Sequence, residues 1–142
     1  MVEVCILESG EKLINLKEIE GRVSPHHDGL DRALKVRAEG FSHLDDVLGM
    51  VIFLGGKIEV LGRREDWAVS KEIFPGVKAY FIFYRADEEF PATLKVLFSG
   101  DKLNLMSGED LCGIIIFYVN HMLRYVRLSN PGKKLPEVCY RV

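Results

Sequence analysis

The segment from Asp87 to Leu111 constrains the fold of this chain more than any other stretch of its length. An acidic turn, Asp87-Glu88-Glu89, and a proline precede residues that alternate between apolar and polar up to Phe98, which is the pattern of a strand with one buried face. Ser107 then precedes two acids and a long apolar run, which is the pattern of a capped helix. The segment therefore predicts a strand and a helix that pack as one unit.

The overall composition is that of one soluble globular domain. A chain of 142 residues with 48% hydrophobic and 28% charged residues buries a sufficient core without a disulfide or a metal. Its net charge of −2 argues against a general affinity for nucleic acid, because such affinity requires a basic stripe. We therefore expect no nucleic-acid partner.

The cysteines and the chain start predict a cytoplasmic protein. The chain has three cysteines, Cys5, Cys112 and Cys139, and no C-x-x-C pair. The sequence therefore contains neither a zinc-ribbon motif nor an iron–sulfur motif. The first residues lack the basic and apolar regions of a signal peptide. The uncharged apolar stretch Leu111–Val119 is far shorter than the roughly 20 residues that span a bilayer, so we expect no membrane association.

The N-terminal half predicts short elements separated by breakers. Two glycines and Pro25 mark residues 17–29 as a loop. Ser42 and Asp45 have the spacing of a capping box, and Gly55-Gly56 has the form of a helix end. The expected elements are a strand at Val2–Leu7 with a hairpin partner at Lys12–Leu16, a helix at Leu30–Glu39, and a helix at Leu44–Leu54.

The C-terminal half predicts most of a sheet and one long helix. Residues 77–84 are apolar on both faces, which places this strand at the centre of the sheet. The expected elements are strands at Lys57–Leu61, Ala68–Phe74, Val77–Tyr84 and Ala92–Phe98, a short return strand at Leu103–Leu105, a helix at Gly108–Leu128, and an extended tail. Together they predict an α+β fold: a mostly antiparallel sheet of four to six strands, with two or three helices packed mainly on one face.

Several short motifs give the chain a resemblance to a known family. They occur in the family's order and at close to its spacing, and the Asp-Glu-Glu-Phe-Pro block is the most specific of them. The motifs are Leu54-Gly55-Gly56, Leu61-Gly62, Phe74-Pro75-Gly76-Val77, Asp87-Glu88-Glu89-Phe90-Pro91-Ala92, Leu97-Phe98, and Leu105 with Glu109-Asp110-Leu111. Over roughly residues 48–123 the chain resembles an uncharacterised prokaryotic family, domain of unknown function 3786.

The resemblance implies a shared fold and no assigned activity. Some members of the family carry a cysteine-rich segment of iron–sulfur type, which this chain lacks, so we expect no cofactor. The sequence is then interpreted as a single domain, residues 1–142. It has a variable N-terminal part at 1–40, a family-like core at 41–128 and an extended tail at 129–142.

The acids are the first candidates for chemistry. Asp87, Glu88 and Glu89, together with Glu109 and Asp110, are suitable groups for a hard-cation site or for general acid/base catalysis. Successive residues of a strand point to opposite faces, so the three acids converge only if their loop curls. The alternative interpretation is a solvated turn that protects the end of the sheet from aggregation.

Histidines are the second group of candidates. His26, His27 and Asp28 are the densest set of metal-ligand types, although adjacent histidine side chains diverge and remote ligands would be needed. The alternative is a polar surface loop. His121 on the long helix is a candidate catalytic base or, alternatively, a histidine at the edge of the core or of an interface.

Two further surfaces suggest binding. The aromatic residues Trp67, Tyr80, Tyr84 and Phe90 could line a pocket for a small molecule. The long helix is apolar all the way round, although a helix on one sheet needs only one apolar stripe. We therefore expect the second apolar side of the long helix to contact either the predicted helix at Leu44–Leu54 or, as the favoured interpretation, a second copy or a protein partner. The predicted interface residues are Ile116, Phe117, Val119 and Leu123.

Three hypotheses about function follow from these patterns. The favoured one is a binding or accessory module that acts through self-association or a protein partner, because the long helix has an unpartnered apolar side and no catalytic motif is present. The first alternative is a metal-dependent or acid/base enzyme that uses the Asp87–Glu89 and Glu109–Asp110 acids. The second alternative is a small-molecule sensor that uses the aromatic pocket.

Overall fold

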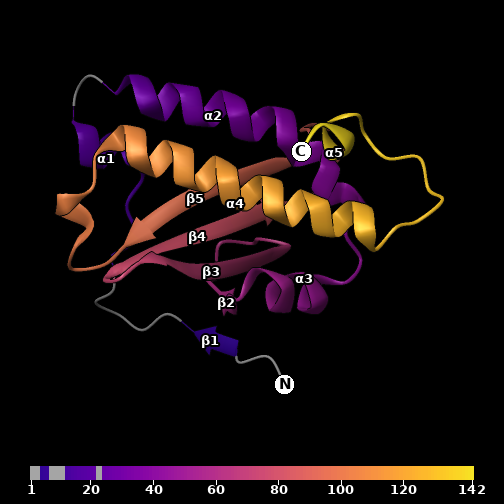
Figure 1. The fold of residues 1–142 in the computed structure, drawn as a ribbon, viewed down its shortest axis with the longest axis horizontal. Helices are drawn as coiled ribbons and strands as arrows, with labels where there is room; N and C mark the ends of the chain where they lie inside the picture. Colours follow the sequence, from indigo (N-terminus) through magenta and orange to yellow (C-terminus); the bar gives the residue numbers. More distant parts are fainter. Residues whose placement is uncertain (1–3, 7–11, 22–23) are drawn as a thin grey trace.

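The computed structural model describes residues 4–6, 12–21 and 24–142, and in them it shows a five-stranded sheet with a layer of helices on one face (Figure 1). The strands are β1 (Val4–Ile6), β2 (Lys57–Val60), β3 (Trp67–Phe74), β4 (Val77–Tyr84) and β5 (Thr93–Ser99). The helices are α1 (Leu16–Glu20), α2 (Pro25–Ala38), α3 (Val47–Leu54), α4 (Gly108–Leu128) and α5 (Val138–Arg141). The predicted α+β fold with a mostly antiparallel sheet is confirmed.

The strand order in the sheet is β1-β2-β3-β4-β5. Strands β2 to β5 pair with their neighbours in antiparallel fashion, whereas β1 pairs with β2 in parallel. The antiparallel strands follow one another along the chain and are joined by short turns, one of which contains Gly76. The sheet is thus a meander of four strands with one parallel strand added at its edge.

Strand β4 is the centre of the structure. It has the predicted bounds and a neighbour on each side. Phe81 and Phe83 face the helices and belong to the main core, while Tyr80 and Ile82 are buried on the opposite face. Because both faces are covered, the strand needs apolar residues at every position of its middle, as the sequence predicts.

Helix α4 covers the sheet and also has the predicted bounds. Ser107 caps it, because its Oγ accepts a hydrogen bond from the Asp110 N–H at 3.1 Å. The fully buried stripe recurs at helical spacing: Leu111, Ile115, Val119, Met122 and Val126. By length and composition α4 is the one helix in the described residues that could cross a membrane, but helices at the core of soluble proteins pass the same test.

The prediction of a loop at residues 17–29 is wrong. Helix α1 occupies Leu16–Glu20 and begins with a capping box between Asn15 and Glu18. Helix α2 begins at Pro25. Proline is favourable at this position because the N–H groups of the first turn make no hydrogen bond within the helix, so the N–H that proline lacks is not needed. Gly29 lies inside α2, where it only lowers helix propensity.

Two other N-terminal predictions also need correction. The capping box predicted at Ser42 and Asp45 is not formed, because residues 39–43 make a 3₁₀ turn; Asp46 caps α3 instead, through the Gly49 N–H. The predicted hairpin partner at residues 12–16 bonds elsewhere: Ile14 pairs with Phe98 at the edge of β5. Of the predicted first strand, residues 4–6 form β1, and residues 2, 3 and 7 lie outside the described residues.

Two C-terminal predictions are wrong. The predicted return strand at Leu103–Leu105 is a 3₁₀ turn, which closes back on Lys102 and Leu103 rather than pairing with a strand. The tail, predicted to be extended, contains the short helix α5, whose Cys139 is fully buried. Val138 also packs against the core, and Arg127 of α4 donates to the Cys139 carbonyl oxygen at 3.4 Å, so both apolar and polar contacts hold this helix in place.

We predict opposite effects of alanine at two glycines. A Cβ at Gly56 would overlap the backbone carbonyl oxygen of Ser70 on β3, whereas a Cβ at Gly113, on the exposed side of α4, would meet nothing. Gly56→Ala should therefore destabilise the protein by about 1–3 kcal/mol, and Gly113→Ala should stabilise it by about 0.5–1 kcal/mol. Urea unfolding curves measure both; a stabilised Gly56→Ala would contradict the close packing of the connection between α3 and β2 on β3.

Candidate functional site

The acidic segment Asp87–Glu89 forms a closed turn at the surface. Asp87 Oδ1 accepts hydrogen bonds from the backbone N–H groups of Glu89 at 2.8 Å and Phe90 at 2.7 Å, and the Asp87 N–H bonds the Phe90 carbonyl at 2.9 Å. All three acids are exposed. The carboxylate of Asp87 is therefore used to shape the turn, as expected for aspartate in such positions.

The other predicted acids lie at the opposite end of the sheet. Glu109 and Asp110 are in the first turn of α4, and Figure 1 shows that this end of α4 is remote from the connection between β4 and β5. Strand β5 separates the two groups along its full length, roughly 20 Å for a seven-residue strand at about 3.3 Å per residue. The two sets of acids are not brought together.

The predicted metal ligands diverge within the first turn of α2. His26 Nδ1 lies 2.5 Å from Glu20 Oε2, while His27 Nε2 faces Asp31 Oδ2 at 3.5 Å. Within residues 4–6, 12–21 and 24–142, no group of three or more histidine, cysteine or acidic side chains is placed to hold a metal ion. His26, His27 and Asp28 thus do not converge.

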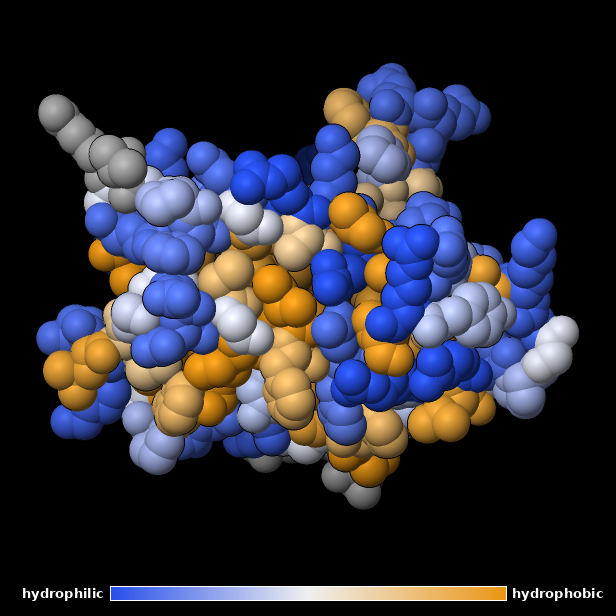
Figure 2. Space-filling model, turned by 45° about the horizontal axis from the view of Figure 1, so that its top comes forward, coloured by the Kyte–Doolittle hydropathy of each residue, from blue (hydrophilic) through white to orange (hydrophobic). Residues whose placement is uncertain are grey.

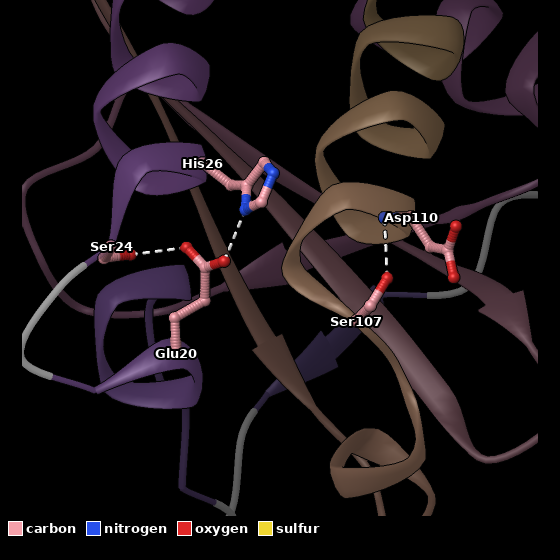
Figure 3. Close-up of polar contacts among 5 residues, drawn as sticks. All are labelled: Glu20, Ser24, His26, Ser107 and Asp110. Atoms are coloured by element: carbon pink, nitrogen blue, oxygen red, sulfur yellow. Dashed lines mark hydrogen bonds and ion pairs between the residues drawn. The ribbon is translucent and has the colours of Figure 1, made fainter.

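The structure instead forms a polar cluster of Glu20, Ser24 and His26 beside the start of α4 (Figure 3). Ser24 Oγ donates to Glu20 Oε1 at 2.6 Å, and His26 Nδ1 lies beside the other carboxylate oxygen. The Glu20 side chain is only 13% exposed. Its position requires glycine at residue 108, because a Cβ there would overlap the carboxylate.

Hydrogen bonds stabilise the charged form of Glu20. The bond from Ser24 is the largest influence that lowers the pKa of this carboxyl group, burial opposes it, and His26 lowers the pKa further. His26 Nδ1 can donate to the carboxylate, which leaves Nε2 as the ring nitrogen turned away from Glu20 in Figure 3. A carboxylate that orients a histidine in this way is also a recurring part of acid/base sites.

Neither of the two cysteines whose side chains the structure describes, Cys112 and Cys139, is an activated nucleophile. Cys112 follows Gly108 by one turn of α4, and its pKa is raised by burial and by the negative charge of Glu20. Burial also raises the pKa of Cys139. A reactive thiol requires the opposite shift, so the cluster does not act as a cysteine–histidine pair.

The four aromatic residues predicted to form one pocket lie apart. Trp67 stacks on Phe83 at 5.2 Å on the face that carries the helices. Tyr80 and Tyr84 point from β4 to the other face, since strand residues alternate. Phe90 is in the surface turn and 66% exposed. No common pocket for these four side chains is formed.

Helices α3 and α4 carry an apolar surface that reaches solvent. Ile52 is 69%, Phe117 60%, Leu48 52% and Phe53 38% exposed. His121 connects the two helices here, because its ring stacks on Phe53 at 4.4 Å, one turn of α4 after Phe117. We call these four apolar residues and His121 the α3–α4 surface. Figure 2 shows apolar surface across the middle of the side that carries the helices.

The predicted interface residues divide between this surface and the core. Phe117 is exposed and Ile116 is partly buried, but Val119 and Leu123 have no exposed area. The helix is covered on its sides as well as on the sheet; Leu123, for example, packs closely against Gly40, which Cys139 of α5 also approaches. Val119 and Leu123 therefore lie inside the fold and cannot contact a partner.

A polar link holds α3 against α4 beside this surface. Tyr125 Oη donates to Asp46 Oδ2 at 2.8 Å, while Asp46 Oδ1 accepts from the Gly49 N–H at 2.8 Å. The Gly49 N–H and then the Tyr125 hydroxyl lower the pKa of Asp46, and the carboxylate in turn raises the pKa of Tyr125. The link fixes the position from which α3 presents Leu48 and Ile52.

Sequence reasoning missed two parts of this arrangement. Glu20 and Ser24 lie in the segment that was predicted to be a loop, and the capping pair Asn15 and Glu18 was the available signal for α1. Residues of α3 were not predicted at the interface, although the run Val47–Leu54 contains no polar side chain on any face. A helix of that composition has more apolar surface than one core contact uses.

The fold and these sites define a small α+β protein without a recognisable catalytic centre in its described residues. A family model described as a domain of unknown function (DUF3786) matches residues 7–121. The chain therefore belongs to that family, and the match extends further toward the N-terminus than the motifs in the sequence indicate. No curated protein and no solved structure matches the chain.

We predict that Glu20 makes stability depend on pH. Its pKa in the folded protein is below the ordinary value of 4.5, so the folded state releases this proton more readily than the unfolded state does. The stabilisation is present above pH 4.5 and is lost as the pH falls through the lowered pKa. Glu20→Gln should be less stable near neutral pH, and its stability should fall less steeply on acidification.

Urea unfolding between about pH 7 and pH 3 measures this difference as the slope of unfolding free energy against pH. Glu88→Gln is the matched control, because Glu88 is an exposed acid at the other end of the sheet. Identical slopes for Glu20→Gln and the wild type would contradict the assigned role of Glu20.

Proposed function

We propose that this protein is a binding module that works by assembling with a second copy of itself through the α3–α4 surface. The observation that carries the proposal is the exposure of four large apolar side chains on two adjacent helices: Leu48, Ile52, Phe53 and Phe117. Monomeric soluble proteins rarely expose contiguous apolar surface of this kind, and where they do it commonly marks an interaction site.

The energetic argument is the burial of Ile52 and Phe117. Each is more than half exposed in the single chain, and full burial of such side chains contributes about 1.5–3 kcal/mol apiece. In a twofold dimer the same surface serves both copies, so each residue contributes twice. These contributions, together with those of Leu48 and Phe53, are of the same size as the cost of association, about 4–15 kcal/mol, which a dimer must exceed.

Preorganisation further supports the proposal. Phe53 is held by the rings of His121 and Tyr125, and Tyr125 is bonded to Asp46 at the start of α3. Because these contacts fix the helices before any partner arrives, little side-chain entropy remains to be lost at this part of the surface. The acid/base alternative has no comparable support, since its two groups of acids lie at opposite ends of the sheet.

Substitution at the centre of the surface tests the proposal. The untagged wild-type protein should sediment as a dimer at micromolar concentration, and Phe117→Asp and Ile52→Asp should each sediment as monomers. A buried carboxylate is costly, so we expect the dissociation constant to rise at least about 100-fold, as a loss of about 3 kcal/mol implies. Sedimentation velocity over a concentration series provides the measurement.

Phe90→Asp is the matched control. Phe90 is an equally exposed phenylalanine, 66% against 60% for Phe117, and it lies in the turn between β4 and β5. This variant should remain dimeric, and circular dichroism should show the same fold for all variants. A wild type that is monomeric throughout the series, or a dimer that Phe90→Asp also dissociates, would overturn the proposal.

A further inference from the structure

Strand β5 forms one edge of the sheet, and the chain pairs with that edge at a single position. Ile14 and Phe98 exchange two backbone hydrogen bonds, at 2.9 and 2.7 Å, in antiparallel register. The next residue, Asn15, caps α1, so the chain turns away from the edge after this one pair. In the described part of the chain no strand then lies beside residues 93–97 on the outer side of β5.

The direction of the Phe98 bonds shows which backbone groups of β5 face this edge. Residues of an antiparallel strand turn their N–H and C=O groups alternately to the two sides. Because β4 and β5 pair without a register shift, Val96 and Leu94 turn outward as Phe98 does. Their four backbone groups meet no hydrogen-bonding partner among the residues that the structure describes. These residues are only 7% and 4% exposed, and unpaired backbone groups in such positions are unfavourable.

Two cavities lie along this edge and leave space beside the outward groups. One, of about 320 Å³, begins at Asn15, and the other, of about 260 Å³, ends at Pro91. Asp31 of α2 and Lys95 of β5 line both, so the cavities are neighbours, and α2 runs alongside them (Figure 1). We call this space between α2 and residues 93–97 the β5 groove; at about 3.3 Å per residue it accommodates roughly five residues of an extended strand.

The charges of the groove indicate which kind of strand it accepts. Lys95 is exposed on the face of the sheet opposite to the helices, and its ammonium lies 5.5 Å from the centre of the Tyr84 ring. In the described residues it forms no ion pair. The carboxylate of Asp31 belongs to the α2 side and faces His27 at 3.5 Å. A strand added to β5 therefore places a side chain next to Lys95, where an acidic group is favourable.

The same lysine disfavours a second copy of β5 as the added strand. A twofold antiparallel pair that uses both outward residues sets Leu94 opposite Val96 of the other copy. Lys95 is then directly opposite the same lysine of that copy. Like charges in this position destabilise a strand pair, and an edge lysine commonly prevents such pairing. The strand that the groove accepts thus has a different sequence.

We propose that the β5 groove binds an extended acidic peptide segment of a partner protein as an added antiparallel strand. The peptide backbone bonds to Leu94 and Val96 as Ile14 bonds to Phe98, and an acidic side chain lies beside Lys95. In strand addition to an open edge, main-chain bonds supply affinity and side-chain contacts supply specificity. The groove shares no residue with the α3–α4 surface, and the proposal does not depend on the proposed assembly.

NMR titration with a short peptide tests the proposal. The probe is the acetylated and amidated pentapeptide Thr-Val-Glu-Val-Thr, whose glutamate is placed opposite Lys95 and whose valines are placed opposite Val96 and Leu94. The largest amide shifts should occur at Leu94 and Val96, and hydrogen exchange of these two amides should slow at least about tenfold at saturation. Absence of binding at millimolar peptide, or shifts centred on another part of the protein, would overturn the proposal.

Two altered peptides distinguish strand pairing from nonspecific contact. N-methylation of both valines removes the N–H donors that face β5, so this peptide should cause no shifts in the groove. Lysine in place of the glutamate should weaken binding about three- to tenfold, or about 0.7–1.4 kcal/mol, because it faces Lys95. Undiminished binding of the methylated peptide would show that the backbone does not pair and would refute the proposal.

A charge reversal in the protein locates the peptide. Lys95→Glu should bind the lysine peptide more tightly than the glutamate peptide. Lys78→Glu is the matched control and should keep the wild-type preference, because Lys78 is an exposed lysine on the same face of β4 and lines neither cavity. An unchanged preference in Lys95→Glu, or an equal reversal in Lys78→Glu, would contradict the assigned position.

The α3–α4 surface provides an independent control. Phe117→Asp changes that surface and leaves the β5 groove intact, so this variant should bind the glutamate peptide with the wild-type affinity. Loss of binding in Phe117→Asp would place the peptide on the α3–α4 surface and contradict the proposal. A wild-type monomer that binds the peptide in the groove would overturn the proposed assembly and support this site.

Discussion

The packing of α4 on the doubly buried strand β4 is the contact on which the remaining structure depends. At about 1.5 Å per residue the 21-residue helix is roughly 31 Å long, which exceeds the eight-residue strand beneath it. Each other helix then makes its own contact along α4. Glu20 at the end of α1 rests on Gly108, Arg37 of α2 donates to Asn120 at 2.8 Å, and Asp46 before α3 accepts from Tyr125. The contacts along α4 therefore place the polar cluster, the α3–α4 surface and the other helices.

The elements that the sequence predicts correctly are those whose signal is local. Strand β4 and helix α4 have unambiguous patterns, two-sided burial in the first and a capped apolar run in the second, and both have the predicted bounds. The predictions are wrong where the same residues are compatible with two different structures. Pro25 was interpreted as a breaker, although proline also begins helices. The three residues Leu103–Leu105 are too few to distinguish a strand from a 3₁₀ turn by periodicity.

The sites were less predictable, because they depend on which distant segments meet. Acidic residues near each other in sequence lie at opposite ends of the sheet once β5 separates them, and the two neighbouring histidines of α2 turn to different partners. The Glu20 cluster exists because α1 packs against the start of α4, which no local pattern indicates. Likewise, the apolar circumference of α4 indicated more than one contact, but only the positions of the segments packed around α4, α5 and the turn at Gly40 among them, determine that Val119 and Leu123 are covered while Phe117 is not.

The parallel pairing of β1 with β2 has a consequence for the order of folding. Strands β2 to β5 are consecutive, so each pair closes a short loop, whereas β1 reaches β2 only across the residues that form α1, α2 and α3. Closing a longer loop costs more chain entropy before any contact compensates for it. The meander and its helices can thus form a cooperative unit first, with β1 joining a completed edge. Opening of that edge exposes backbone groups of β2 without disturbing β4 or α4, so β1 can leave the sheet while the meander stays folded.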